Sequence, residues 1–329
     1  MRVVVVGAGA IGSAYAWLLA RAGHDVAIVD VRRDHVEAVA RDGLVAVLPD
    51  GEQAVRVAAT TEPEALAPAE FVLVATKSFS TREAAARMGP LLRPRTLVAT
   101  VQNGLGNDRA LADVLGPRVV LPGSTTVAAE PAGPGRVRIS KATLASGSTT
   151  SLGPPRDAPE LLGDVRRLCE ELTAAGLPAE ALPDVDVVVW RKLALAGSMA
   201  PLSAVLGFTI ADVIENPAAT ALLRRLVEEI VAVARATGVD LDLDETWALA
   251  LATYGSVGPH RASMAVDVAE RRPTEIDAMC VEVARLGREH GVPAPVNEVV
   301  GELVRAIEHH SGARARPAPE ALLAAAASG

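Results

Sequence analysis

Residues 3–30 read VVVVGAGAIGSAYAWLLARAGHDVAIVD, and this stretch decides the fold. A run of valines leads into a glycine-rich turn, an Ala-rich segment and a second apolar run that ends in Asp30. Gly7, Gly9 and Gly12 fit the pattern G-x-G-x-x-G, whose glycines allow a tight turn, close approach of the backbone to a pyrophosphate, and close packing of helix on strand. Because an acid follows 18 positions after Gly12, the stretch predicts a dinucleotide-binding βαβ unit.

The turn and the acid also indicate which residues would contact the dinucleotide. A carboxylate at Asp30 can accept hydrogen bonds from ribose hydroxyls and would repel a 2'-phosphate, so it favours NAD(H). Arg32 and Arg33 follow within reach and could hold that phosphate, which leaves NADP(H) as the alternative. In this part of the chain we expect cofactor contacts from Gly7, Ala8, Gly9, Ala10, Ile11, Gly12, Asp30 and Arg32.

Val-rich runs alternate with Ala-rich helical patterns through the first half of the chain. Strands that are apolar throughout are buried on both faces, which predicts a parallel sheet covered by helices on either side. The runs are RVVVVG (2–7), DVAIVD (25–30), EFVLVATK (70–77), TLVATVQNG (96–104) and RVVLPGSTTVA (118–128).

In the second half the strand signal gives way to long amphipathic patterns such as NPAATALLRRLVEEIVAVARATG (216–238), with Gly238 as the expected stop. The fold class is therefore α/β, with an N-terminal Rossmann-type domain and an all-helical C-terminal domain. We expect the boundaries 1–183 and 184–313, a flexible tail over 314–329, and a hinge in GLPAEALPDVD (176–186).

Composition excludes several classes of protein. The chain has 329 residues and is 50% hydrophobic but only 2% aromatic, as expected of a globular protein with Ala, Val and Leu in its core. A formal charge of -8, without a run of Lys and Arg interleaved with aromatics, argues against nucleic acid. Cys169 and Cys280 match no metal-ligand spacing and read as reduced thiols. We therefore expect no metal. Since no signal peptide follows Met1, we expect a cytoplasmic protein.

The longest uncharged run, Leu193–Ala211, follows Lys192 directly. Its nineteen residues would satisfy the length of a membrane span, but glycines, serines and Pro201 interrupt it, so we expect a core helix broken or kinked at the proline. Lys192, Ala196 and Ala200 are spaced to share one face of that helix. Lys192 is then either a solvated residue of the first turn or a desolvated acid suited to protonating a carbonyl.

Polar residues also follow two later strands, where open parallel sheets bind ligands. Thr76 and Lys77 end one run, and Gln102 and Asn103 end the next; an ordinary turn or a solvated loop lysine is the alternative. Further on, Ser263, Asp267 and Glu275 are polar residues of a half-buried stretch, which could equally be a capped helix.

Four of these motifs together resemble the ketopantoate reductase (2-dehydropantoate 2-reductase) family. They are GAGAIG (7–12), QNGLG (102–106), WRKLA (190–194) with PLSAVLG (201–207), and RASMAVDVAERRPTEID (261–277). The resemblance implies an NAD(P)H-dependent oxidoreductase that reduces a 2-oxo acid to a 2-hydroxy acid. It also implies that Lys192 is the general acid, that Glu275 orients lysine and substrate, that Asn103 contacts substrate and nicotinamide, that Ser263 binds substrate, and that Lys77, with Thr76 and Gln102, lies by the cofactor.

Two departures from the family pattern bear on the substrate. The family usually has asparagines where this chain has Ala196 and Ala200, and Asn-Gly where it has Cys280 and Val281. Loss of polar groups that discriminate a hydroxylated substrate would leave an apolar wall lined by the two alanines. The hypotheses are therefore a ketopantoate reductase, a D-2-hydroxyacid dehydrogenase of the mandelate type acting on a more apolar 2-oxo acid, and a non-catalytic dinucleotide-binding protein. The expected partner is a small 2-oxo acid, and the candidate assembly is a homodimer.

Overall fold

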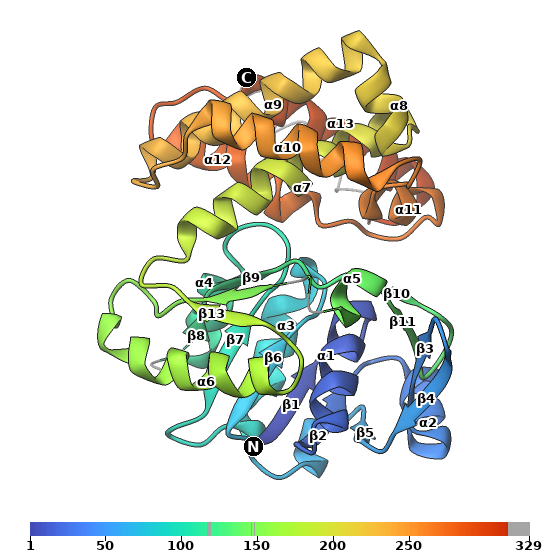
Figure 1. The fold of residues 1–329 in the computed structure, drawn as a ribbon. Coiled ribbons are helices and arrows are strands. Elements are labelled where there is room, and N and C mark those ends of the chain that lie inside the picture. Colours follow the sequence, from blue (N-terminus) through green and yellow to red (C-terminus); the bar gives the residue numbers. More distant parts are fainter. Residues whose placement is uncertain (117–119, 146, 148, 315–329) are drawn as a thin grey trace. The chain divides into compact units, whose positions relative to one another are not determined.

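The computed structural model describes residues 1–116, 120–145, 147 and 149–314 (Figure 1). These residues form two compact units, which divide between Val189 and Trp190. Unit 1 precedes the division and unit 2 follows it. The predicted tail lies outside the described residues from 315 onward.

Unit 1 is built on a parallel sheet of six strands among the described residues, in the order β5-β2-β1-β6-β7-β8. Because β1 is central and the chain runs outward from it in both directions, the order reverses between β1 and β6. Ligands of open α/β sheets bind at the carboxyl ends of strands at such a reversal. The strands are β1 Arg2–Val6, β2 Asp25–Val29, β5 Ala58–Thr60, β6 Phe71–Val74, β7 Leu97–Thr100 and β8 Val120–Leu121.

Alternate residues of β1 enter two different cores, as the uninterrupted valine run predicts. Val3 and Val5 pack in one cluster with Trp17 of α1, whereas Val4 and Val6 pack in another that includes Leu111 of α4. The sheet is therefore covered on both faces, and the predicted Rossmann-type architecture is confirmed. The helices of unit 1 are α1 Ala10–Arg21, α2 Arg33–Asp42, α3 Thr81–Arg87, α4 Asn107–Leu115, α5 Lys141–Leu144 and α6 Leu162–Ala174, with short 3-10 helices η1 Pro63–Ala65, η2 Ser78–Ser80, η3 Gly89–Leu91 and η4 Pro159–Leu161.

Two smaller sheets accompany the main one and were not expected. The predicted run 118–128 divides into β8 of the main sheet and β9 (Gly123–Thr125), which joins β12 (Thr150–Leu152) and β13 (Ala179–Ala181). The expected hinge, 176–186, therefore contributes a strand, and strand structure continues past the point where its sequence signal fades. The other sheet has the order β10-β11-β3-β4, with β3 Leu44–Leu48, β4 Gly51–Val55, β10 Ala129–Pro131 and β11 Arg136–Ile139.

Unit 2 is helical over its described residues, as predicted. The side chain of Asn216 accepts hydrogen bonds from the first amides of α9, and Gly238, at φ +89°, follows the end of that helix. The expected stop at Gly238 is confirmed, whereas the cap at Asn216 was not identified from the sequence. The helices are α7 Asp186–Leu206, α8 Ile210–Glu215, α9 Pro217–Ala236, α10 Leu243–Val257, α11 Ser263–Ala269, α12 Cys280–Glu289 and α13 Pro295–Ser311, with the 3-10 helix η5 Ile276–Ala278.

The long uncharged run forms most of α7, and the helix continues through Pro201. The expected break at the proline is therefore wrong. Among the described residues, no helix is both long and apolar enough to cross a membrane.

Candidate active site

The three glycines of the first turn meet different surroundings. A Cβ on Gly7, whose φ is +92°, would lie 2.6 Å from the backbone nitrogen of Thr76, and one on Gly12 would lie 2.0 Å from the carbonyl oxygen of Gly7. A Cβ on Gly9 would meet nothing within 4 Å. Gly7 and Gly12 therefore allow the loops and helix to pack, while Gly9 leaves open space at the start of α1.

That open space adjoins backbone donors. The first helical hydrogen bond of α1 runs from Ser13 N to Gly9 O at 2.9 Å, so the amides of Ala10, Ile11 and Gly12 precede the helical ladder. Gly9 supplies no side-chain cap, and the first turn has no acidic residue. Unpaired amides and the positive end of the helix dipole make this terminus suited to a pyrophosphate.

Asp30 lies just past β2 and is almost fully buried, with 8% of its surface exposed. Its Oδ2 accepts the amide of Ala8 at 2.8 Å, and its Oδ1 accepts the amide and Nε of Arg32 at 2.9 and 3.2 Å. Arg32 also donates to the carbonyl of Ala8 at 3.0 Å. Asp30, which favours NAD(H), and Arg32, which could hold the phosphate of NADP(H), thus form an ion pair. Both residues are hydrogen-bonded to Ala8 of the glycine-rich turn.

Gln102 joins the ends of β6 and β7. Its Nε2 donates to the carbonyl of Thr76 at 2.7 Å and to Oγ1 of Thr81 at 2.9 Å, and its Oε1 accepts from Thr100 at 2.9 Å. These bonds hold the two loops in register, so Gln102 shapes this edge of the sheet. Lys77 is exposed next to Thr76, where η2 begins.

Asn103 sits in a tight loop after β7. Gly104 and Gly106 have φ of +86° and +78°, values that glycine adopts readily, and Gly106 leads into α4. The buried Asn107 donates from Nδ2 to the carbonyl of Asn103 at 3.0 Å and accepts a hydrogen bond from Thr81 at 3.1 Å. Thr81 and Asn107 fix the backbone of Asn103. Neither was identified from the sequence, although Asn107 directly follows the motif that contains Asn103.

In unit 2, α7 carries Lys192, Ala196 and Ala200 at helical spacing. Lys192 and Ala196 are partly exposed, whereas Ala200 is buried. Burial lowers the pKa of Lys192 from its ordinary 10.5 to about 8, although the carboxylate of Glu275 acts in the opposite direction. Of the two alternatives, the lowered pKa favours the desolvated lysine over the solvated one.

The helix tolerates Pro201 because another group takes over a lost hydrogen bond. Proline has no amide proton, so Pro201 cannot donate to the carbonyl of Gly197 four residues before it. The Sγ of Cys280 lies 3.4 Å from that carbonyl and donates to it. Burial raises the pKa of Cys280 to about 12, which keeps the thiol proton in place. Cys280, which the sequence grouped with the altered substrate residues, therefore faces a backbone carbonyl of α7.

The remaining predicted residues lie on α11 and the segment after it. Ser263 is the first residue of α11 and is exposed. Asp267 is buried, and its Oδ1 accepts Nη2 of Arg272 at 2.8 Å. Glu275 is buried, with 6% of its surface exposed, and precedes η5. Lys192 and Glu275 are thus electrostatically coupled within one unit, although 83 positions separate them in sequence.

An anion-binding turn on a parallel sheet and a desolvated lysine coupled to a glutamate define a dinucleotide-dependent oxidoreductase. The profile of the family described as Ketopantoate reductase PanE/ApbA matches residues 3–154, and that of its C-terminal part matches residues 184–308. The chain belongs to the ketopantoate reductase family, as the motifs led us to expect.

Individual relatives agree with this assignment. A 2-dehydropantoate 2-reductase of Mesorhizobium japonicum is 32% identical, covering 95% of this chain and 99% of its own. The crystal structure of a PanE/ApbA family ketopantoate reductase from Ralstonia eutropha JMP134 is 33% identical, with a TM-score of 0.85 over 95% of this chain and all of the other. A D-mandelate dehydrogenase solved with NADH and anilino(oxo)acetate shares the fold, with a TM-score of 0.88 at 24% identity, over 95% of this chain and all of its own.

Proposed function

We propose that this protein is a 2-dehydropantoate 2-reductase that reduces the 2-oxo group with NADH or NADPH. The observation that carries the proposal is the pair formed by Lys192 and Glu275, in a chain that belongs to the ketopantoate reductase family. A lysine with a lowered pKa beside a glutamate supports catalysis over dinucleotide binding alone.

The lysine supplies the proton that the reaction needs. As a hydride reaches the keto carbon, negative charge builds on the carbonyl oxygen, and the ammonium of Lys192 stabilises that charge and then protonates the oxygen. With a pKa of about 8, most of the lysine is protonated at neutral pH and still gives up its proton more readily than an ordinary lysine. Glu275 keeps the ammonium form populated and orients it, while Asn103 and Ser263 bind the substrate.

We expect the cofactor to lie along the glycine-rich turn and the ends of β2 and β6. The pyrophosphate would meet the amides of Ala10, Ile11 and Gly12, where Gly9 leaves room. Two large apolar side chains, Val31 and Phe79, are 75% and 52% exposed and follow β2 and β6, the strands on either side of β1. These side chains would flank a flat adenine ring. A nicotinamide dinucleotide bound there supplies the hydride.

NADH is the favoured cofactor. Asp30 would accept a ribose hydroxyl, and the 2'-phosphate of NADPH would have to draw Arg32 away from Asp30 and approach a buried carboxylate. We expect kcat/KM with NADH to exceed that with NADPH by about tenfold. Asp30→Ala frees Arg32 and should reverse the preference, whereas a protein that prefers NADPH without any substitution would refute the assignment.

A second candidate function has one observation in its favour. The face of α7 below Lys192 presents methyl groups at Ala196 and Ala200, which hold no donor or acceptor for a hydroxylated substrate. Such a wall suits a branched or aromatic 2-oxo acid, as in a D-2-hydroxyacid dehydrogenase of the mandelate type. Cys280 gives this candidate no further support, because its thiol donates a hydrogen bond to the backbone carbonyl of Gly197.

Steady-state kinetics on a panel of oxo acids tests the function. The rates of 2-dehydropantoate, 2-oxoisovalerate, 2-oxoisocaproate and phenylglyoxylate would be measured with NADH and with NADPH. The proposal expects the highest kcat/KM with 2-dehydropantoate. A clear preference for an apolar acid would support the second candidate, and cofactor binding without turnover of any oxo acid would refute both.

A further inference from the structure

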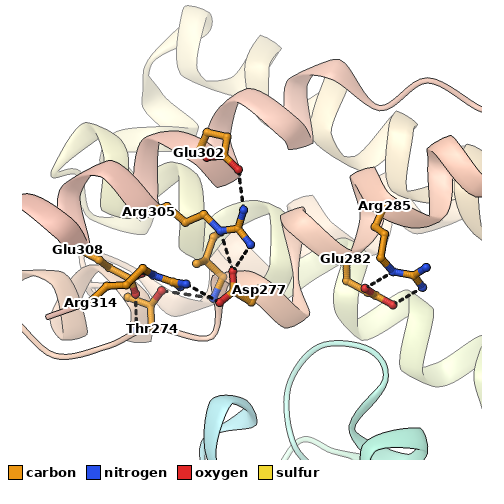
Figure 2. A network of polar contacts seen from close by, with 9 residues as sticks. Thr274, Asp277, Glu282, Arg285, Glu302, Arg305, Glu308 and Arg314 are labelled. Carbon is orange, nitrogen blue, oxygen red and sulfur yellow. Dashed lines mark hydrogen bonds and ion pairs between the residues drawn. The ribbon is translucent and has the colours of Figure 1, made fainter. Parts of the chain in front are cut away.

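A cluster of charged side chains binds the backbone amide of Thr274 and the carboxylate of Asp277 (Figure 2). Thr274 and Asp277 flank the glutamate in sequence, and both are bound by residues at the end of the last described helix, α13. We propose that Glu308 and Arg314 are positioning residues, which hold Glu275 where it acts on Lys192. This inference rests on the proposed function and extends it to residues outside the family motifs noted in the sequence.

Glu308 is the inner member of the cluster, and only 1% of its surface is exposed. Its Oε1 accepts the backbone amide of Thr274 at 2.6 Å, and its Oε2 accepts Nε of Arg314 at 2.6 Å. A buried carboxylate is costly unless its oxygens are paired. Both oxygens are paired here, and one of the partners is the residue next to Glu275.

Arg314 is the bridging member. Its Nη1 pairs with Oδ2 of Asp277 at 2.8 Å, while its Nε serves Glu308. The chain reaches this place because Gly312, at φ +79°, ends α13 in the left-handed region and turns the backbone back, so that the amide of Arg314 meets the carbonyl of Glu308 at 3.2 Å. Glu308 therefore holds the Thr274 side of Glu275, and Arg314 holds the Asp277 side while it pairs with Glu308.

Arg305 completes the hold on Asp277. Its Nη2 and Nε lie 2.6 and 2.8 Å from Oδ1 of Asp277, and its Nη1 pairs with Glu302 at 2.7 Å. Two guanidinium groups therefore share one carboxylate, and they lower the pKa of Asp277, which keeps it ionised. When Arg314 is replaced, Arg305 still pairs with Asp277. The substitution would therefore loosen the segment around Glu275 without detaching it from α13.

The position of Glu275 matters because its effect on Lys192 depends on distance. Coulombic interaction weakens as two charges separate, and misplacement of a catalytic group by about 1 Å can cost up to about a hundredfold in rate. A loosened segment should therefore change two measurable quantities together, the turnover rate and the pKa of Lys192. A purely structural ion pair would change neither in the folded protein.

The test compares Arg314→Met with a matched control, Arg288→Met. Arg288 pairs with Glu298 at 2.6 Å and joins α12 to α13 without contacting the segment around Glu275. We expect Arg314→Met to lower kcat about tenfold and the control to change it less than about twofold. Glu308→Gln is the milder variant, since its amide oxygen can still accept the amide of Thr274. The kcat of Glu308→Gln should lie between those of Arg314→Met and the control. We expect Glu308→Gln to fold even if Arg314→Met does not.

The pKa of Lys192 is read without turnover. The sequence has three lysines, Lys77, Lys141 and Lys192, so NMR of the reductively ¹³C-methylated protein gives few signals, and Lys192→Arg identifies the relevant one. Arg314→Met or Glu308→Gln should lower this pKa relative to the control, because Glu275 then supports the ammonium less. If a folded Glu308→Gln protein matches the control in both kcat and this pKa, the inference is overturned. Failure of the unmodified protein to reduce any oxo acid would refute the proposed function alone, because the NMR titration still reports on the cluster.

Discussion

The pH dependence of the reaction follows from the environment of Lys192. Its pKa of about 8, against an ordinary 10.5, corresponds to about 3 kcal/mol in favour of the neutral amine. Reduction needs the ammonium form, so kcat/KM should be level below the pKa and fall about tenfold for each pH unit above it. From pH 7 to pH 9 the protonated fraction drops by about tenfold, and the reduction rate should follow it. Oxidation of the hydroxy acid needs the neutral amine and should rise over the same range.

Glu275→Gln tests the cause of that pKa. The carboxylate favours the ammonium form, so removing its charge should move the fall in kcat/KM to lower pH, in addition to lowering the rate. Glu289→Gln is the control, because Glu289 is exposed at the end of α12 and pairs with Arg285. The assay is kcat/KM for oxo-acid reduction between pH 6 and about pH 10.5, which reports the pKa of the free enzyme. An inflection near 10.5 would refute the desolvated lysine, and an inflection that does not move in Glu275→Gln would refute the coupling.

Four substitutions test the local structure that supports the sites. Gly12→Ala places a methyl group 2.0 Å from a carbonyl oxygen and should lower the melting temperature markedly. Gly9→Ala should leave the melting temperature unchanged and weaken NADH binding in a fluorescence titration, and equal loss of stability in both would contradict the roles assigned to these glycines. Cys280→Ala leaves the carbonyl of Gly197 without a donor and should lower the free energy of unfolding by about 1 to 3 kcal/mol in urea denaturation. Because Pro201→Ala restores the helical amide, Cys280→Ala should cost less in that background, and strictly additive effects would show that the thiol does not serve this carbonyl.

The sequence was most informative where the physics is local. Four of the five predicted strand runs each contain one strand of the main sheet, because Val-rich segments buried on both faces carry their own signal. The fifth run is interrupted by Pro122, which separates β8 of the main sheet from β9 of another sheet. Strand β4 went unrecognised because it is mostly exposed and carries Glu52 and Gln53 in place of apolar residues.

What the sequence missed depends on contacts between distant positions. The helix continues through Pro201 because Cys280, 79 positions away in sequence, donates a hydrogen bond to the carbonyl of Gly197. Rules about proline in helices consider only neighbouring residues and could not predict this contact. Glu308 and Arg314 likewise belong to no motif, and their connection to Glu275 arises only when α13 packs beside that segment. The family motifs identified Lys192 and Glu275 directly, whereas their catalytic roles, the homodimer and the cytoplasmic location stay predictions.

The central claim is that Lys192 donates the proton during reduction of a 2-oxo acid. The most direct measurement is single-turnover oxidation of bound NADH by 2-dehydropantoate in Lys192→Met, which replaces the side chain as far as Cε and removes the ammonium group. The account predicts that the rate falls by about 10² to 10⁴-fold, that NADH affinity is almost unchanged, and that the residual rate loses its dependence on pH around 8. A Lys192→Met protein that reduces the oxo acid at a near-normal rate, or that keeps the same inflection near pH 8, would contradict the claim.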